Sequence, residues 1–300
     1  MNAVCVLVSA PRCEVDIGPR EGVESRLKSQ PLEFSASLTR VLKSSQSSAA
    51  NLASRRFDLR VVEETDAWIV VDKPPLIEVH PSKPGGARTL WDGLRDLLAY
   101  EIANGGQVSI INRLDRETSG LTLIAKDRAT ARSFSRQMAA RVVQKEYLAI
   151  VWGWPERDEW TMDAPLLRIG SVRPSPIYLK QGVHPSGLPA KTRFVVERRF
   201  RRETSNGSEF ALVRAFPETG RTHQIRVHLA ESGHRILGDK IYGPDENCYL
   251  EFIDTGWTPQ LAQRLVLPRH ALHSTALRIG RDGPAWEVDL APDLAAFLNP

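Results

Sequence analysis

The chain has 300 residues, of which 42% are hydrophobic and 25% charged, and it carries a formal net charge of +4 with a pI near 9.0. This composition is typical of a globular protein of one or two domains and excludes collagen-like, low-complexity and largely disordered chains. No segment approaches the roughly 18 apolar residues of a membrane span, so we expect a cytoplasmic protein. The basic excess fits a polyanionic partner but does not by itself indicate one.

The chain contains three cysteines, Cys5, Cys13 and Cys248, which show no C-x-x-C spacing. An odd number with this spacing predicts neither a disulfide framework nor a zinc site. We therefore expect reduced, structural thiols.

The N-terminal region differs in pattern from the rest of the chain. Residues 44–54 are rich in serine and alanine and lack a sustained apolar period, and the one amphipathic candidate nearby is Leu32–Val41. Strand-like patterning begins near Leu59. These observations predict a loosely structured extension over residues 1–60 and a folded domain over residues 61–300.

The folded domain begins with a strand that includes Trp68–Val71, followed by a loop over Pro81–Gly86. The apolar spacing over Thr89–Ala103 predicts a helix, which Asn104–Gly106 would stop. The leucines expected on its buried face are Leu90, Leu94, Leu97 and Leu98.

Two short apolar strands, Val108–Ile111 and Leu121–Ala125, bracket a polar segment. Asp127 is a suitable N-cap for a helix that we expect to extend to about Val142. We expect Phe134, Met138 and Val142 to face the core. The opposite face of this helix carries a basic stripe, which is either a solvated surface or a contact for an anion; its residues are Arg128, Arg132 and Arg136.

The remaining chain predicts mainly strands without regular βαβ alternation. The expected strands are Tyr147–Val151, Thr192–Val196, Phe210–Phe216, Leu272–Ile279 and Trp286–Leu290. Proline-rich loops are expected over residues 155–190, and a short helix capped by Thr222 is expected to end at Gly233. This order favours an α+β fold with a mixed, mainly antiparallel central sheet and flanking helices and loops.

The polar segment between the expected strands Val108–Ile111 and Leu121–Ala125 presents Asp115 between Arg113 and Arg116. Gly120 closes this loop. A carboxylate beside cations stays ionised, which suits nucleophilic or base chemistry. Taken alone, the same residues fit an aspartate that accepts hydrogen bonds from loop amides.

The segment Arg113–Leu121, with the sequence R-L-D-R-E-T-S-G-L, resembles the catalytic signature of the RluA-type pseudouridine synthases, which isomerise uridine in ribosomal or transfer RNA. Further segments resemble this family in order and spacing, over about residues 61–300. They are Lys73-Pro74, Val79–Pro81, Lys145–Tyr147, Gly220–Leu229, Gly233-His234, Ile236–Asp239, Tyr242-Gly243 and Arg269–His273.

The resemblance implies a pseudouridine synthase fold and an isomerisation that needs no cofactor and no metal. It assigns catalysis to Asp115, which either attacks the sugar or abstracts a proton to form a glycal. Tyr147 would stack on the base and assist proton removal at carbon 5, and Arg226 would hold Asp115 ionised and oriented. His223 and His228 are five residues apart, unlike the i, i+4 histidines of a helical zinc site.

The resemblance also implies which residues contact the substrate. A uridine in paired RNA must be flipped out before it can react, and Arg113 would fill the gap that the base leaves. Leu272 would line the uracil pocket. Further contacts are expected from Thr118, Arg221 and His223.

Two features depart from the family pattern. Asn112 stands where many relatives have histidine, and we expect it to change the hydrogen bonding of the loop rather than abolish activity. The N-terminal region shows no recognisable small RNA-binding domain of the kind that many relatives carry. The tryptophans Trp152, Trp154 and Trp160 could stack on RNA, but a core cluster is the favoured interpretation. The arginines within Arg193–Arg202 fit phosphate contact and a solvated strand edge equally.

The sequence therefore predicts a cytoplasmic RNA pseudouridine synthase that acts on rRNA or tRNA as a monomer, without membrane or small-molecule partners. One alternative is a non-catalytic RNA-binding or RNA-chaperone protein on the same fold, which has no need of a carboxylate in the path of an anionic ligand. A metal-dependent hydrolase is a second alternative, disfavoured by the absence of metal-ligand spacing. The sequence does not indicate the target nucleotide.

Overall fold

The computed structural model describes residues 59–82 and 85–299, and the following account is confined to them. The expected extension up to residue 58, with its amphipathic segment Leu32–Val41, lies outside the described residues, as do Cys5 and Cys13. Cys248 is a buried free thiol. Within the described ranges, no helix is long and apolar enough to cross a membrane.

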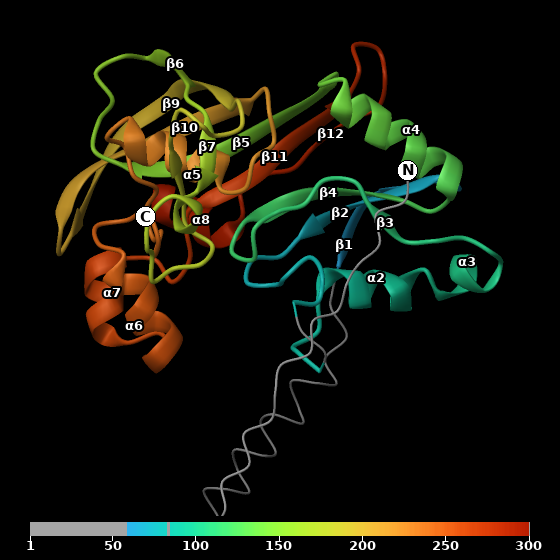
Figure 1. Cartoon of the computed structure of the whole chain (residues 1–300), viewed down its shortest axis with the longest axis horizontal. Coiled ribbons are helices and arrows are strands. Elements are labelled where there is room, and N and C mark those ends of the chain that lie inside the picture. The colour runs from blue at the N-terminus through green and yellow to red at the C-terminus, as the bar shows by residue number, and fades with distance from the viewer. Residues whose placement is uncertain (1–58, 83–84, 300) are drawn as a thin grey trace, which may run out of the picture. The chain divides into compact units, whose positions relative to one another are not determined.

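A ten-stranded, mostly antiparallel sheet forms the centre of the fold (Figure 1). Its main path runs β1-β2-β4-β11-β5-β10-β9-β6, with β3 paired to β4 and β12 to β11, and β7 and β8 form a small second sheet. The β4–β11 pair is parallel. The strands are β1 (Arg60–Glu64), β2 (Trp68–Lys73), β3 (Ser109–Ile110), β4 (Ser119–Ala125), β5 (Val143–Trp152), β6 (Glu159–Asp163), β7 (Leu166–Arg168), β8 (Gln181–Val183), β9 (Lys191–Thr204), β10 (Gly207–Pro217), β11 (Leu272–Ile279) and β12 (Ala285–Glu287).

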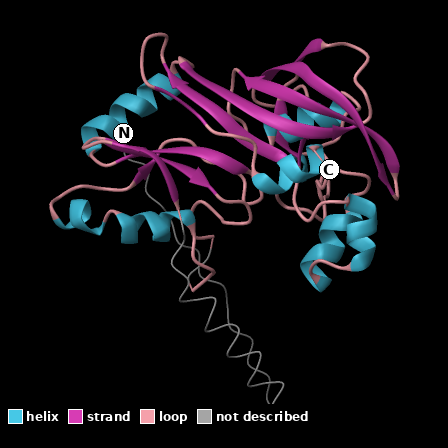
Figure 2. Ribbon diagram, turned by 180° about the vertical axis from the view of Figure 1, so that it is seen from behind, coloured by secondary structure: helices cyan, strands magenta, loops and turns pink. Residues whose placement is uncertain are grey.

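Helices lie on both faces of this sheet, as the view from behind shows (Figure 2). The described helices are α2 (Leu90–Leu97), α3 (Ala99–Ala103), α4 (Arg128–Ala139), α5 (Gln224–Glu231), α6 (Asn247–Thr255), α7 (Pro259–Leu265) and α8 (Pro292–Leu298), and a 3-10 turn covers Ile169–Ser171. The expected α+β fold with a mainly antiparallel sheet is confirmed.

Helices α4 and α2 cover opposite faces of the β2–β4 half of the sheet (Figure 1). Successive residues of a strand point to opposite faces. Accordingly Val70 packs in the cluster that contains Phe134 of α4, whereas Ile69 and Val71 pack with Leu94 of α2.

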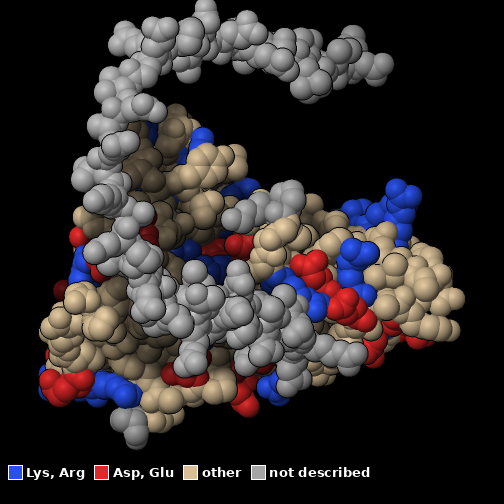
Figure 3. Space-filling model, turned by 90° about the horizontal axis from the view of Figure 1, so that it is seen from below, with Lys and Arg blue, Asp and Glu red and all other residues tan. Residues whose placement is uncertain are grey.

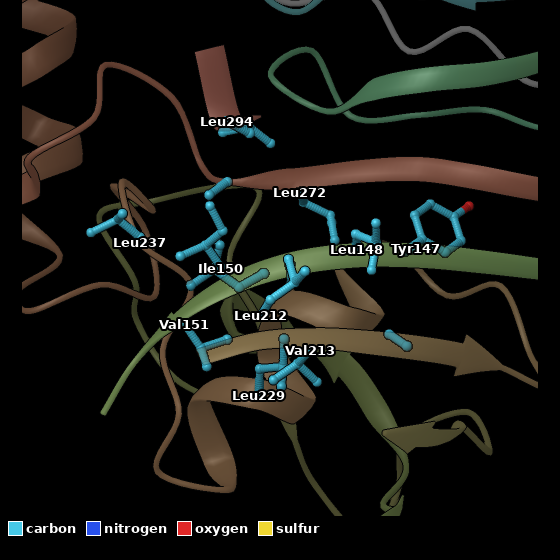
Figure 4. Close-up of a cluster of buried hydrophobic side chains, with 14 of the residues drawn as sticks. Tyr147, Leu148, Ile150, Val151, Leu212, Val213, Leu229, Leu237, Leu272 and Leu294 are labelled. Carbon is cyan, nitrogen blue, oxygen red and sulfur yellow. The ribbon is translucent and has the colours of Figure 1, made fainter. Parts of the chain in front are cut away.

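The largest buried cluster joins β5, β9, β10 and β11 to α5 and α8. Figure 4 shows that Tyr147 lies at one end of this cluster, with its hydroxyl directed away from the neighbouring aliphatic side chains. Leu272 belongs to the same cluster. One edge of the core thus supplies an aromatic ring and an aliphatic side chain to the cavity described below.

Both expected helices of the first half are present, but the first is interrupted and the second ends earlier than predicted. The first is divided at Leu98 into α2 and α3, and Leu97 is 46% exposed because only the i, i+4, i+8 line of Leu90, Leu94 and Leu98 faces the sheet. The second, α4, begins after the Asp127 N-cap and ends at Ala139. The prediction that Val142 faces the core is wrong.

The early end of α4 has a local cause. Arg141 adopts a left-handed conformation, with φ 57°, which turns the chain out of the helix. Val142 therefore lies beyond the helix and is 43% exposed.

Three other expectations need correction. Residues 155–190 are not loops throughout, because β6, β7 and β8 lie there and β6 pairs with β9 as an edge strand. Thr222 does not cap α5, since His223 is the N-cap. The sequence patterns did not predict α6, α7 and α8, although Pro259 and Pro292 stand in the first turns of α7 and α8, where proline is favoured.

Candidate active site

The loop that carries Asp115 is fixed at both ends. The amide of Asn112 donates to the carbonyl of Leu121 at 3.0 Å and accepts from the backbone N–H of Leu123 at 2.8 Å, so a side chain takes the place of a strand partner. At the other end, Gly120 has φ +108°, and a Cβ there would lie 2.2 Å from the carbonyl oxygen of Ser274. Only glycine permits this close approach of β4 to β11.

Asp115 forms an ion pair with a buried arginine from α5. Nη1 of Arg226 lies 2.8 Å from Oδ2 of Asp115. Nε and Nη2 of the same guanidinium donate to the two oxygens of Asp239 at 2.7 and 2.9 Å. Asp239 also accepts from the backbone N–H groups of Ile241 and Tyr242. A bidentate carboxylate thus fixes the arginine that contacts Asp115.

Asp115 is ionised at neutral pH. Burial raises the pKa of its carboxyl group, but the charges of His223, Arg226 and His270 outweigh burial and lower the pKa to about 2. Burial and the nearby Arg226 lower the pKa of His223 to about 4, so this histidine is neutral at pH 7. Arg226 is therefore the cation that holds Asp115 ionised under neutral conditions.

The hydrogen bonds around His223 indicate its tautomer. The hydroxyl of Tyr242 accepts from the backbone N–H of Gln181 at 2.8 Å and lies 2.8 Å from Nδ1 of His223. Because Nε2 faces the carboxylate of Asp115, we assign the proton of the neutral ring to Nε2, and the Tyr242 hydroxyl then donates to Nδ1. Nε2 lies 3.8 Å from Oδ2 of Asp115, so the imidazole presents an N–H to the carboxylate.

His223 is also one of the few non-glycine residues with positive φ, at 57°. This conformation costs of order 1–3 kcal/mol and persists only where the surroundings impose it. Here it turns the chain from the preceding loop into α5 and directs the imidazole toward Asp115.

A second buried network holds the loop that carries Asp115 in place. Glu117 accepts from Nζ of Lys240 at 2.6 Å and from the backbone N–H of His270 at 3.0 Å. Nε2 of His270 lies 2.7 Å from Oγ1 of Thr118. Lys73, which is fully buried, donates to the carbonyls of Pro74, Ile77 and Arg116. These contacts tie the loop to three distant segments of the chain.

Above this network lies a cavity of about 690 Å³, within the usual range for ligand sites. Asp115, Tyr147 and Leu272 line it. Burial raises the pKa of the Tyr147 phenol to about 12, so the hydroxyl keeps its proton at neutral pH. Cations and polar side chains complete its lining, among them Arg113, Thr118, Lys145, Arg221, His223 and Arg226.

The sequence model of a family described as RNA pseudouridylate synthase matches residues 67–231, a range that includes Asp115, Tyr147 and Arg226. The chain belongs to this family. It is 34% identical over 247 residues to a ribosomal large subunit pseudouridine synthase D of Nitrosomonas europaea, covering 80% of this chain and 64% of that relative. It is 35% identical over 187 residues to a dual-specificity RNA pseudouridine synthase RluA of Vibrio parahaemolyticus, covering 62% of this chain and 70% of the relative. The chain thus spans slightly less than two thirds of the Nitrosomonas relative.

Solved structures of the same family share the fold. Human RNA pseudouridylate synthase domain containing 1 superposes with a TM-score of 0.58 at 26% identity, over 80% of this chain and 85% of the human chain. Human RNA pseudouridylate synthase domain containing 4 gives a TM-score of 0.61 at 23% identity, over 86% and 96%. The predicted family and its fold are confirmed.

The structure of this pseudouridine synthase family member brings together most of the residues predicted for the site. Asp115, Tyr147, Arg226, His223 and Leu272 all line the cavity, as do Arg113 and Arg221. Thr118 is 2% exposed and contacts His270, which favours support of the loop over direct contact with a ligand.

The expectation about the cations beside Asp115 is wrong. Among the described contacts, neither Arg113 nor Arg116 pairs with this carboxylate, and Nε of Arg116 donates instead to the carbonyl of Leu76 at 3.4 Å. Arg226, which the family resemblance assigned as the partner of Asp115, forms the ion pair instead. Sequence reasoning also missed Asp239 as the second partner of Arg226, although Asp239 lies in one of the matched segments.

Most arginines within Arg193–Arg202 form ion pairs or hydrogen bonds with other residues of the described chain. Arg193 pairs with Glu159, Arg199 with Asp158 and Arg201 with Glu209. On the face shown in Figure 3, some Lys and Arg side chains lie beside Asp and Glu side chains, whereas others stand apart from them. These contacts favour the structural role of this run over phosphate binding.

The three tryptophans also make contacts within the protein. Trp152 and Trp160 pack against the large core cluster, and the ring of Trp154 lies under the guanidinium of Arg201.

In contrast, the arginine stripe of α4 is exposed and makes no ion pair or hydrogen bond within the described part of the chain; it comprises Arg128, Arg132 and Arg136. Among the described residues, no three His, Cys, Asp or Glu side chains are grouped to share a metal ion.

Proposed function

We propose that this chain isomerises uridine to pseudouridine in RNA, with Asp115 as the catalytic carboxylate. One observation carries the proposal: an ionised carboxylate, held by a buried arginine at 2.8 Å, opens into a cavity lined by Tyr147 and Leu272. Its side chain keeps 28% of its surface exposed, so a ligand in the cavity can reach it. Because relatives are named ribosomal large subunit synthases, large-subunit rRNA is the first RNA to test.

The reaction balances without a co-reactant. The bond between uracil N1 and ribose C1′ breaks, the base turns, C5 bonds to C1′, and the proton lost from C5 is balanced by a proton gained at N1. Asp115 can attack C1′, or it can remove the proton at C2′ to give a glycal; both need an ionised carboxylate. Deuterium at C2′ distinguishes them, because a primary isotope effect is expected only for the glycal route.

We propose that Tyr147 serves as the platform for the flipped base. An aromatic face stacks on any base, and Leu272 lines the same cavity. Because the phenol is protonated at neutral pH, its hydroxyl must give up its own proton, for example to uracil N1, before it can take one from C5. Tyr147→Phe should retain activity if the ring only stacks, and should stall after cleavage of the N1–C1′ bond if the hydroxyl relays a proton.

Asp115→Asn tests the proposal directly. We expect no release of tritium from RNA labelled at uridine C5, with RNA affinity within about twofold of the unsubstituted protein, since the amide keeps the shape of the side chain. Asp158→Asn is the matched control, because Asp158 also pairs with an arginine but its side chain is 84% exposed and does not line the cavity. Normal turnover by Asp115→Asn would refute the assignment.

A non-catalytic RNA-binding protein is the alternative. It would bind RNA equally well with and without Asp115 and would release no tritium in either form. The burial of Asp115, Arg226 and Asp239 argues against this alternative. Removing these charges from water costs about as much free energy as their pairing returns, so a protein that only binds RNA gains little stability from them. Pseudouridine maps of RNA from cells with and without the gene decide between the two.

We further propose that the enzyme acts as a monomer. We also propose that it needs no metal or cofactor, because the product has the same atoms and the same oxidation state as the substrate. Activity on a short RNA should survive excess chelator. Loss of activity that zinc alone restores would contradict this.

A further inference from the structure

Lys145 lies on the same face of β5 as Tyr147, two residues earlier, and it lines the cavity. Its ammonium reaches the opposite wall, where Nζ lies 3.5 Å from the position that a Cβ on Gly220 would take. Because Gly220 has no side chain, the space in front of the ammonium stays open. The lysine is thus directed into the same cavity as the proposed base platform.

Other buried cations in the described residues have acceptors. Lys73 donates to three carbonyls, Lys126 to Glu64 and Glu101, and Lys240 to Glu117 and the carbonyl of Pro268; Arg226 and Arg269 each bind aspartates. Lys145 is half-buried, yet within the described part of the chain it has no hydrogen-bond or ion-pair partner. Burial lowers its pKa.

A half-buried ammonium without an acceptor is unfavourable unless a ligand supplies one. The charges in the cavity wall indicate the chemical class of that ligand. Asp115 is already paired with Arg226, so it is not free to neutralise Lys145. An arriving anion is the remaining partner, and in RNA the anion nearest to a base and its ribose is the backbone phosphate.

We propose that Lys145 binds a backbone phosphate next to the nucleotide whose base enters the cavity. This inference rests on the proposed function, and it adds a contact that anchors the flipped nucleotide from its charged side while Tyr147 and Leu272 hold the base. The contact positions the ribose over Asp115.

A chemical double-mutant cycle tests the contact. The probe is an RNA hairpin with one unpaired uridine in its loop, made with natural phosphates or with a neutral methylphosphonate on the 5′ or the 3′ side of that uridine. Affinity is measured by fluorescence anisotropy between about 50 and 200 mM salt for the unsubstituted protein and for Lys145→Met, Lys145→Arg and Lys191→Met. Lys191 pairs with Glu218 outside the cavity and is the matched control.

We expect Lys145→Met to weaken binding about tenfold at low salt and to reduce the salt slope by about one unit. One of the two methylphosphonates should weaken binding of the unsubstituted protein and of Lys145→Arg about tenfold, but that of Lys145→Met less than twofold. Lys191→Met should behave as the unsubstituted protein does. Circular dichroism confirms that each variant is folded.

Equal losses from each methylphosphonate in the unsubstituted protein and in Lys145→Met would overturn the proposal. A fall in turnover with such additive affinities would overturn it as well, since that result places the lysine on the departing uracil. These affinities require no turnover, so they are independent of the test of the proposed function. Strong coupling in a protein that forms no pseudouridine would refute the isomerase and leave the phosphate contact standing.

Discussion

Asp239→Asn removes one charge from the buried trio of Asp115, Arg226 and Asp239 with almost no change of shape. Asp239 is fully buried, and its two oxygens accept from Nε and Nη2 of Arg226 at 2.7 and 2.9 Å. In the asparagine variant, Oδ1 can still accept from the backbone N–H groups of Ile241 and Tyr242. The NH₂ group then faces the N–H of Arg226, donor against donor.

The cost follows from these contacts. A hydrogen bond to a charged group contributes roughly 1.5–3 kcal/mol, and breaking a buried ion pair on one side typically costs about 3–5 kcal/mol. We therefore expect the free energy of unfolding to fall by about 3–5 kcal/mol. For a domain of this size, that corresponds to a decrease in Tm of about 6–20 °C.

The same change should slow the reaction, because Arg226 loses the partner that orients it toward Asp115. A misplacement of about 1 Å at a reacting group costs about 10²-fold, so kcat should fall by about that factor while KM changes little. Denaturant titration and single-turnover kinetics measure the two effects.

Asp245→Asn is the control, since Asp245 pairs with Arg264 at 3.0 Å but its side chain is 43% exposed. Solvent screens such pairs, and the control should lose less than about 1 kcal/mol with normal kinetics. A loss below about 1 kcal/mol together with normal kcat in Asp239→Asn would refute the positioning role.

Three further predictions concern the base, the pH and the RNA surface. Arg113→Ala should slow single-turnover modification far more in a stem-loop than in a single strand with the same uridine, because extrusion of a paired base costs a few kcal/mol; equal losses would exclude a wedge role. The folded-state pKa values of His223 and His270, about 4, lie below the ordinary 6.5, so the unfolded chain takes up protons first and stability should be full above pH 6.5 and fall toward pH 4; a Tm that stays constant from pH 7.5 to 4.5 would contradict this. Replacing the arginines of the α4 stripe by glutamine should lower the salt slope of RNA binding by about one unit for each phosphate that the helix no longer binds, and an unchanged slope would show a solvated face; the substitutions are Arg128→Gln, Arg132→Gln and Arg136→Gln.

The sequence by itself was sufficient for most strands of the main sheet, the family and the residue types of the site, but not for β6, β7 and β8. Short, nearly continuous apolar runs predict β2 and β4, because a strand that is covered on both faces is apolar on both. The signature around Asp115 is contiguous, so its residues can be recognised without knowledge of the fold. Asp127 likewise predicts the start of α4, because an N-cap is a local interaction.

Helix ends were less predictable, since they depend on single backbone conformations. The left-handed Arg141 ends α4 before Val142, and the left-handed His223, rather than Thr222, precedes α5. Neither residue type favours that conformation strongly enough to be identified from the sequence.

The local sequence did not indicate which charges meet: the family resemblance named Arg226 for Asp115, and only the tertiary structure shows the contact and its second partner, Asp239. Arg113 and Arg116 are the neighbours of Asp115 in sequence, but neither pairs with it, while Arg226 pairs with Asp115 across 111 positions. The reason is burial: an ion pair removed from water interacts strongly, whereas charges adjacent along an exposed loop are screened. Lys145 also differs from the other buried cations for a tertiary reason, because the position opposite its Nζ belongs to Gly220, which is distant in sequence and has no side chain.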